Sequence, residues 1–239
     1  MSERLLRIVS IASAVLMLSP ATPNVALAGS IAAATRQLPE LDAPPGGTAA
    51  WIAQAMRLNG VPMTIKSFAA SMNAQEVLHY YERRLRSSNT QTKRWHEGEN
   101  HVLGVLSDNA YITVRARNTA HGAQGTITVT PPLAKQRSML RTRFPHPPSA
   151  RVANLQQYED EGIEAEHISF VSAHSVASAA RELTQFLREK GWTVHRSAPM
   201  FQTRGGHVIE AQKDASLAHL SFRRLKSGET AILVVWKKT

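Results

Sequence analysis

An internal repeat is the feature of this sequence that most constrains its fold. A shift of 102 residues aligns apolar positions and turn residues without a gap as far as the end of a helical pattern. Four extra residues then enter the second copy, and a shift of 106 continues the alignment. The matches include Pro45 with Pro147, Gly60 with Gly162, Ser67-Phe68 with Ser169-Phe170, and His101-Val102-Leu103 with His207-Val208-Ile209. Self-similarity at a fixed spacing indicates one structural unit used twice. Identities are few, so chance similarity of two generic segments is the alternative.

Each copy contains one amphipathic helix pattern. In the first copy Asn73 and Glu76 have the spacing of a capping box, and five apolar residues follow along one helical face. In the second copy the pattern ends at Gly191, a typical C-terminal stop. The two apolar faces are Ala74, Val77, Leu78, Tyr81 and Leu85, and Val176, Ala179, Ala180, Leu183 and Leu187.

Extended segments surround each helix. The alternation in Tyr111-Ile112-Thr113-Val114-Arg115 is typical of antiparallel strands with one solvated face. The expected strands are 49–56, 63–69, 91–97, 101–106 with 111–117, and 126–130 in the first copy, and 151–158, 166–171, 193–197, 207–212 with 217–224, and 230–237 in the second. The sequence therefore predicts an α+β fold of two tandem ββαβββ modules, each with one helix packed on an antiparallel sheet.

The first 28 residues have the pattern of a secretory signal peptide. Arg4 and Arg7 precede the apolar run Ile8–Leu18, and Ala26-Leu27-Ala28 forms a cleavage site. The run is shorter than the ~20 residues that span a bilayer, which argues against the alternative of a retained anchor. We expect cleavage after Ala28 and a periplasmic or secreted protein with no stable membrane span.

The rest of the chain divides at changes in composition. We expect a flexible leader at 29–47, the first module at 48–131, a basic linker flanked by prolines at 132–147, and the second module at 148–239. Because the chain has no cysteine, its stability cannot come from disulfides and must come from packed cores.

Catalytic motifs are absent from the sequence. It contains no nucleophile elbow, zinc-protease motif, phosphate-binding loop or dinucleotide fingerprint. Ser172, His174 and Ser175 lie at a strand-to-helix turn and are interpreted as capping residues rather than a nucleophile site. The carboxylates Glu159-Asp160-Glu161 are interpreted as a solvated hairpin tip. We therefore expect no catalytic residues and no cofactor.

The ten histidines raise the question of a metal site. On the expected strands His207 and His219 approach each other, with His167 or His195 nearby. No pair has metal-binding helical spacing, so scattered surface histidines are the preferred interpretation and a transition-metal site is the alternative.

The formal net charge of +10 indicates an anionic partner or a solvated basic surface. The candidate partner-binding residues are Lys135, Arg137, Arg141 and Arg143 in the linker, and Arg115, Arg117, Arg223 and Arg224 on equivalent strands. Of the aromatic residues, Trp95 and Trp236 are the exposed candidates for stacking.

The second copy also carries a family resemblance. Pro147-Pro148-Ser149-Ala150-Arg151-Val152 precedes a hairpin, and the helix ends in Phe186-Leu187-Arg188-Glu189-Lys190-Gly191-Trp192. This pattern resembles modules of poorly characterised bacterial envelope proteins and lipoproteins. The resemblance implies an envelope location and a small α+β module, and it brings no catalytic residues.

These observations predict an exported, non-catalytic binding or accessory protein of the bacterial envelope or of a secretion assembly. An open edge strand, such as the proline-led first strand, is a place where a protein partner could add a strand. The alternative is a polyanion binder for nucleic acid, anionic lipid or polysaccharide.

Overall fold

In the computed structural model the described residues are 31–132, 140–160, 163–200 and 205–238. The signal-peptide prediction lies outside them. About 55% of the described residues are in strands and 15% in three helices. The molecule is therefore built mainly from β-structure.

The same order of elements occurs in both halves, namely two strands, a helix and four strands. The first half contains α2 (Ile31–Thr35), β1 (Thr48–Leu58), β2 (Val61–Ala70), α3 (Ala74–Arg84), β3 (Gln91–Glu97), β4 (Asn100–Leu106), β5 (Tyr111–Thr119) and β6 (Gly122–Thr130). The second half contains β7 (Arg151–Asp160), β8 (Ile163–Ser172), α4 (Val176–Glu189), β9 (Thr193–Met200), β10 (Gly206–Lys213), β11 (Ser216–Arg224) and β12 (Thr230–Lys238).

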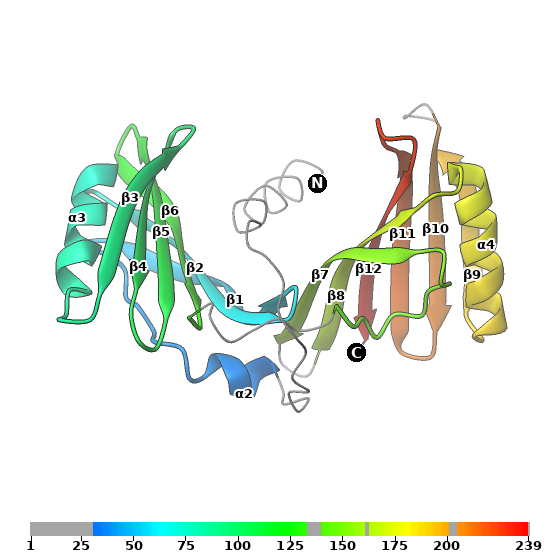
Figure 1. The fold of residues 1–239 in the computed structure, drawn as a ribbon, viewed down its shortest axis with the longest axis horizontal. Coiled ribbons are helices and arrows are strands. Elements are labelled where there is room, and N and C mark those ends of the chain that lie inside the picture. Colours follow the sequence, from blue (N-terminus) through cyan, green and yellow to red (C-terminus); the bar gives the residue numbers. More distant parts are fainter. Residues whose placement is uncertain (1–30, 133–139, 161–162, 201–204, 239) are drawn as a thin grey trace.

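The twelve strands form one antiparallel sheet. Its order is β3-β4-β5-β6-β2-β1-β7-β8-β12-β11-β10-β9. Figure 1 shows α3 and α4 at opposite ends of the molecule, each on the outer side of its half of the sheet. The opposite face of each half therefore turns towards the middle of the molecule.

The predicted fold class, two α+β ββαβββ modules, is wrong. The molecule is mostly antiparallel β-structure in a single sheet, and four strands rather than three follow each of α3 and α4. One reason is that 101–106 with 111–117 is not one strand but the hairpin β4–β5. The chain turns there because the backbone N–H of Ser107 donates to the carbonyl oxygen of Ala110 at 2.9 Å.

The second reason for the difference is the contact between β1 and β7. The end of β1, Met56–Leu58, pairs with residues 156–158 of β7 and makes the two halves one sheet. Strand edges that pair with each other satisfy backbone groups that would otherwise need water. Asn59 extends this junction, because its N–H donates to the Leu155 carbonyl at 2.8 Å and its side-chain oxygen accepts from the Leu155 N–H at 2.9 Å.

The helices begin and end where local sequence places them. Asn73 and Glu76 form the predicted capping box at the start of α3. The Ser175 side chain caps α4 by accepting from the Ser178 N–H. Gly191 follows α4 with a φ of +79°, a conformation that favours glycine, so the predicted stop is confirmed.

Each half has its own hydrophobic core on its helix side. Phe68 and Tyr81 belong to the first core, and Phe170 and Leu183 to the second. Residues outside the repeated elements also contribute. Leu41, in the range expected to be a leader, is buried in the first core. Phe144, in the range expected to be a linker, is buried in the second core, with its ring 5.5 Å from that of Trp192.

None of the helices in the described segments combines the length and the apolar character needed to cross a membrane.

Candidate binding face

The sheet face opposite α3 and α4, called here the inner face, is the candidate functional surface. Alternation along β5 defines it in the first half. Ile112 and Val114 point into the core beneath α3, whereas Thr113 and Arg115 point to the inner face. The strand pairings place the following residues of the first half on the inner face: Lys93, Trp95, Glu97, Gly104, Tyr111, Thr113, Arg115, Arg117, Gln124, Thr126, Thr128 and Ser67.

Two aromatic side chains meet over a glycine on this face. A Cβ atom at Gly104 would lie 2.9 Å from the Tyr111 hydroxyl oxygen and 3.0 Å from Cζ3 of Trp95. Both distances are shorter than ordinary contacts, so the Trp95 ring and the Tyr111 hydroxyl occupy the space that a side chain at residue 104 would take. We call Trp95, Gly104 and Tyr111 the aromatic platform. Both aromatic side chains are partly exposed.

A carboxylate connects the platform with a guanidinium group. Oε1 of Glu97 accepts from the indole Nε1 of Trp95 at 2.8 Å. Its other oxygen, Oε2, pairs with Nη2 of Arg115 at 2.8 Å. The Arg115 side chain is 14% exposed and that of Glu97 is 30% exposed, so this ion pair is partly shielded from solvent. Glu97 therefore fixes both the indole ring and the guanidinium group in place.

Hydroxyl and amide side chains cover the neighbouring part of the face. Thr113 lies between Gly104 and Thr128 across the sheet, and Thr126 lies beside Arg115. The Gln124 side-chain oxygen accepts from Nε of Arg117 at 2.7 Å. These partly exposed groups give a flat surface that is rich in hydrogen-bonding atoms.

The inner face carries an excess of positive charge. Glu97 and Glu210 lie on it, and each is already paired with an arginine, Glu97 with Arg115 at 2.8 Å and Glu210 with Arg196 at 3.6 Å. Four further cations share the face and have no ion-pair partner among the described residues. They are Lys93 and Arg117 in the first half, and Arg223 and Lys237 in the second.

The second half presents different chemistry at equivalent positions. In the first half Gly104 of β4 lies opposite Thr113 of β5. The equivalent residues of the second half are Glu210 of β10 and His219 of β11, which also lie opposite each other. Leu217 and Ser221 correspondingly stand where the first half has Tyr111 and Arg115. Leu217 and Leu233 are 42% and 43% exposed, and Leu233 lines a shallow pocket with Val208, Glu210, His219, Ser221 and Val235. This half of the inner face is therefore more aliphatic.

A tyrosine and a histidine lie on the inner face where the two halves meet. The Tyr158 ring is 5.2 Å from the ring of His167, and its hydroxyl donates to the Gln156 side chain at 2.7 Å. Burial raises the pKa of Tyr158 to about 12. Burial also lowers the pKa of His167, because a charged imidazole loses hydration there.

The structure does not bring the predicted basic residues together in one patch. Arg115 and Arg117 lie on the inner face of the first half, and Arg223 lies on that of the second. Arg224 is exposed at the end of β11.

The remaining candidates belong to the expected linker. Lys135 and Arg137 lie outside the described residues, and Arg141 is exposed. Arg143 forms an ion pair with Glu164, and this hydrogen bond raises its pKa. Its backbone N–H donates to the buried Glu166 carboxylate at 3.1 Å.

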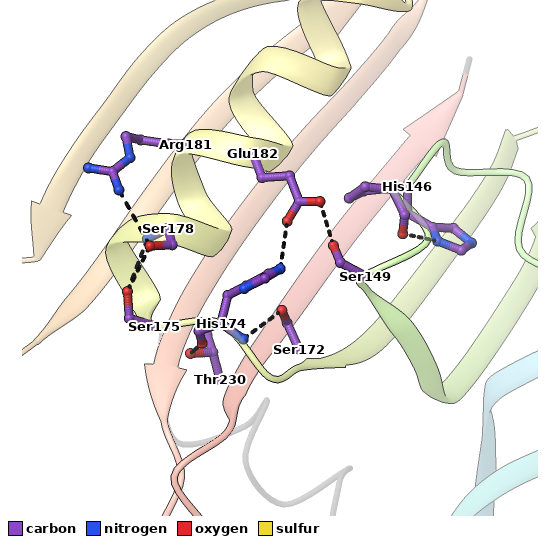
Figure 2. Close-up of polar contacts among 10 residues, drawn as sticks. His146, Ser149, Ser172, His174, Ser175, Ser178, Arg181, Glu182 and Thr230 are labelled. Carbon is purple, nitrogen blue, oxygen red and sulfur yellow. Dashed lines mark hydrogen bonds and ion pairs between the residues drawn. The ribbon is translucent and has the colours of Figure 1, made fainter.

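A serine–histidine–glutamate cluster surrounds the start of α4 (Figure 2). Glu182 accepts from the Ser149 hydroxyl at 2.7 Å and lies 3.7 Å from Nε2 of His174. In a nucleophile triad the histidine stands between the serine and the acid. Here the carboxylate stands between the other two, and the Ser172 hydroxyl accepts from the backbone N–H of His174 at 3.3 Å. The arrangement closes the β8–α4 turn, and Ser175 has the predicted capping role.

The histidines are distributed over both faces. His207 lies on the helix side of β10 near Phe222, whereas His219 lies on the inner face, so the expected approach of these two is wrong. His96 and His101 are cross-strand neighbours, with ring nitrogens 3.1 Å apart. Within the described ranges, no group of three or more histidine, aspartate or glutamate residues is arranged to hold a metal ion.

Sequence reasoning identified only part of this face. Trp95 is partly exposed as expected, but Trp236 is 6% exposed and belongs to the second core. Gly104 and Tyr111 were not identified, because their contact with Trp95 depends on the registers of three strands. The one available signal was the alternation on β5, which placed Tyr111 on the polar side.

Comparisons with protein-family models, with curated proteins and with solved structures gave no match to this chain.

Proposed function

We propose that this chain is an exported, non-catalytic binding protein that holds an anionic polymer on the inner face of its sheet. The observation that carries the proposal is the charge balance of that face. Two of its acids, Glu97 and Glu210, are paired with arginines, and four further cations have no acidic partner among the described residues. A surface with this imbalance attracts polyanions and aligns them along the cations.

The first half of the face is the stronger part of the site. Lys93 and Arg117 flank the Glu97–Arg115 pair, and the same face carries hydroxyls, an amide, two aromatic side chains and the exposed Leu106. The polymer therefore meets charge, hydrogen-bonding groups and apolar rings on one surface. Export, expected from residues 1–28, favours a polymer of the cell surface.

The test measures binding of the purified protein to dextran sulfate while the salt concentration is varied. We expect affinity to fall by at least about tenfold between about 50 and 200 mM salt, since each neutralised charge releases a counterion. The variant K93A/R117A should bind more weakly and show a shallower salt dependence.

A matched control removes two cations from outside the inner face. R83A/R86A changes the net charge equally but alters α3 and the turn after it. It should keep nearly the affinity of the parent protein. Salt-independent binding, or equal losses in the two double variants, contradicts the proposal.

A second candidate is the accessory role in an envelope or secretion assembly, in which the partner is a protein. The exposed Leu217, Leu233 and Ile163 on the second half favour it, because exposed aliphatic side chains on a sheet face are typical of protein contacts. Replacing Leu217 and Leu233 by serine should then abolish recovery of a cross-linked partner while leaving dextran sulfate binding unchanged.

A further inference from the structure

We propose that the aromatic platform is a saccharide subsite, so that the polymer held by the inner face is an acidic polysaccharide whose sugar rings lie on Trp95 and Tyr111. This inference rests on the proposed function and names the class of its ligand.

The platform offers an apolar floor in a polar surface. The Trp95 and Tyr111 side chains meet over Gly104, where a Cβ would lie 3.0 Å and 2.9 Å from them. The indole N–H is occupied by Glu97, so the orientation of the ring is set before any ligand arrives. A sugar ring has one face of C–H groups, and a partly exposed aromatic ring of fixed orientation is the complement of that face.

The groups beside the platform fit the rest of a sugar. Thr113 and Thr128 lie in one row with Gly104, and Arg115 and Thr126 lie in the next. Hydroxyls both donate and accept, so a threonine row can hydrogen-bond to sugar hydroxyls in either sense. Lys93, next to Gly104 across β3 and β4, supplies a charge for a sugar carboxylate.

The second half shows that the platform is not a requirement of the fold. Glu210 stands at the position of Gly104, and Leu217 stands at that of Tyr111. The strands pair in the same way with these other residues. The combination of two aromatic side chains, a glycine and a partly buried arginine is therefore a property of the inner face of the first half alone.

The same features favour a saccharide over a single-stranded nucleic acid. Proteins that follow a nucleic-acid strand stack successive bases on several aromatic side chains along a groove. Here the two aromatic side chains meet at one position, over Gly104. The surrounding surface is rich in hydroxyl and amide groups. One stacked ring among many hydrogen bonds is the arrangement that suits a hydroxyl-rich polymer.

The experiment uses the purified protein with a galacturonic acid hexamer, a neutral maltohexaose of equal length and a dT12 oligonucleotide. Binding is followed by calorimetry and by tryptophan fluorescence. We expect the acidic hexamer to bind best and to change the fluorescence. The variant W95A should lose about tenfold or more in affinity, as expected when a stacked ring is removed.

Two further variants keep the test decisive. G104A removes no binding group, but its methyl group pushes into the space of the Trp95 ring and the Tyr111 hydroxyl, so it should weaken hexamer binding as W95A does. W51A removes another partly exposed tryptophan, which lies on the other side of the sheet. The Lys66 Nζ atom is 4.2 Å from the centre of the Trp51 ring. This variant should bind like the parent protein.

The outcomes separate this inference from the proposed function. Dextran sulfate binding with normal salt dependence, together with unchanged hexamer binding by W95A and G104A, overturns the saccharide subsite and leaves the proposed function standing. Tighter binding of dT12 than of the hexamer through Trp95 also overturns it. If neither dextran sulfate nor the hexamer binds at low salt, both proposals fail.

Discussion

At the scale of single residues, the burial of one histidine on the inner face makes the stability of the protein depend on pH. His167 lies between Gln156 and Val235 across the sheet, with the Tyr158 ring 5.2 Å from its own. These neighbours lower its pKa by excluding water, so the folded protein favours the neutral ring. The unfolded chain, with a histidine pKa near 6.5, binds the proton more readily.

The sign of the pH effect follows from this difference. Between the lowered pKa and about 6.5 the unfolded state holds more protons, so the free energy of unfolding decreases as the pH falls. We expect a small loss of stability between pH 7.5 and 5.5, because this group is only partly buried. Thermal unfolding of H167Q should show a weaker pH dependence, with some remaining because burial also lowers the pKa of His207. H121Q, in an exposed turn, serves as the control and should retain the full dependence.

Which residues could be predicted depended on how local their interactions are. The Asn73–Glu76 capping box and the Gly191 stop involve neighbours within a few positions, and both predictions are confirmed. The platform needs Trp95, Gly104 and Tyr111 to be adjacent across three strands. The burial of Trp236 likewise depends on which side of the sheet α4 covers. Composition and alternation do not contain that information.

At the scale of elements, the β1–β2 turn has two functions. Asn59 and Gly60 have φ values of +50° and +82°, the conformation typical of an Asn-Gly hairpin turn. Asn59 also makes two hydrogen bonds to the backbone of Leu155 in the other half. The same residue therefore turns one hairpin and joins the two halves of the sheet.

Replacement of Asn59 separates these two effects. In N59A the left-handed backbone becomes less favourable and the side-chain bond to Leu155 is lost, so we expect unfolding to become easier by about 1–3 kcal/mol. N59G restores the backbone freedom without the side-chain bond and should be destabilised less. Denaturant unfolding at equilibrium measures both, and equal stability of N59A and the parent protein would contradict this account of the junction.

The strands themselves were mostly recognisable from their alternation, whereas their partners were not. The predicted strand 63–69 corresponds to β2, and 126–130 lies within β6. The sequence patterns of β1 and β7 do not show that Met56–Leu58 pairs with a segment about a hundred residues away. A strand with one buried face has the same sequence pattern in a separate module as in a continuous sheet. For that reason the strand patterns could not show that the two predicted modules share one sheet.

At the scale of the whole molecule, two large cores are connected by a small contact. Among the residues that the structure describes, the cores around α3 and α4 share no buried residue, and between them lies a minor cluster of Ala53, Met56 and Met63. Only three residue pairs of β1 and β7 continue the sheet across the middle. Glu159 adds a further link, because its carboxylate accepts from the backbone N–H groups of Ile31 and Ala32 at the start of α2.

So small a junction implies that the halves open separately, since each core retains most of its contacts when the other is lost. The matched variants L78A and L183A each remove a buried leucine from one helix and should cost about 2–5 kcal/mol. Hydrogen exchange should then become faster in α3, β4 and β5 of L78A, while α4, β10 and β11 keep their protection. L183A should give the reverse pattern. If either variant accelerates exchange equally in both halves, the sheet is one cooperative unit, and the β1–β7 junction transmits far more stability than its three residue pairs indicate.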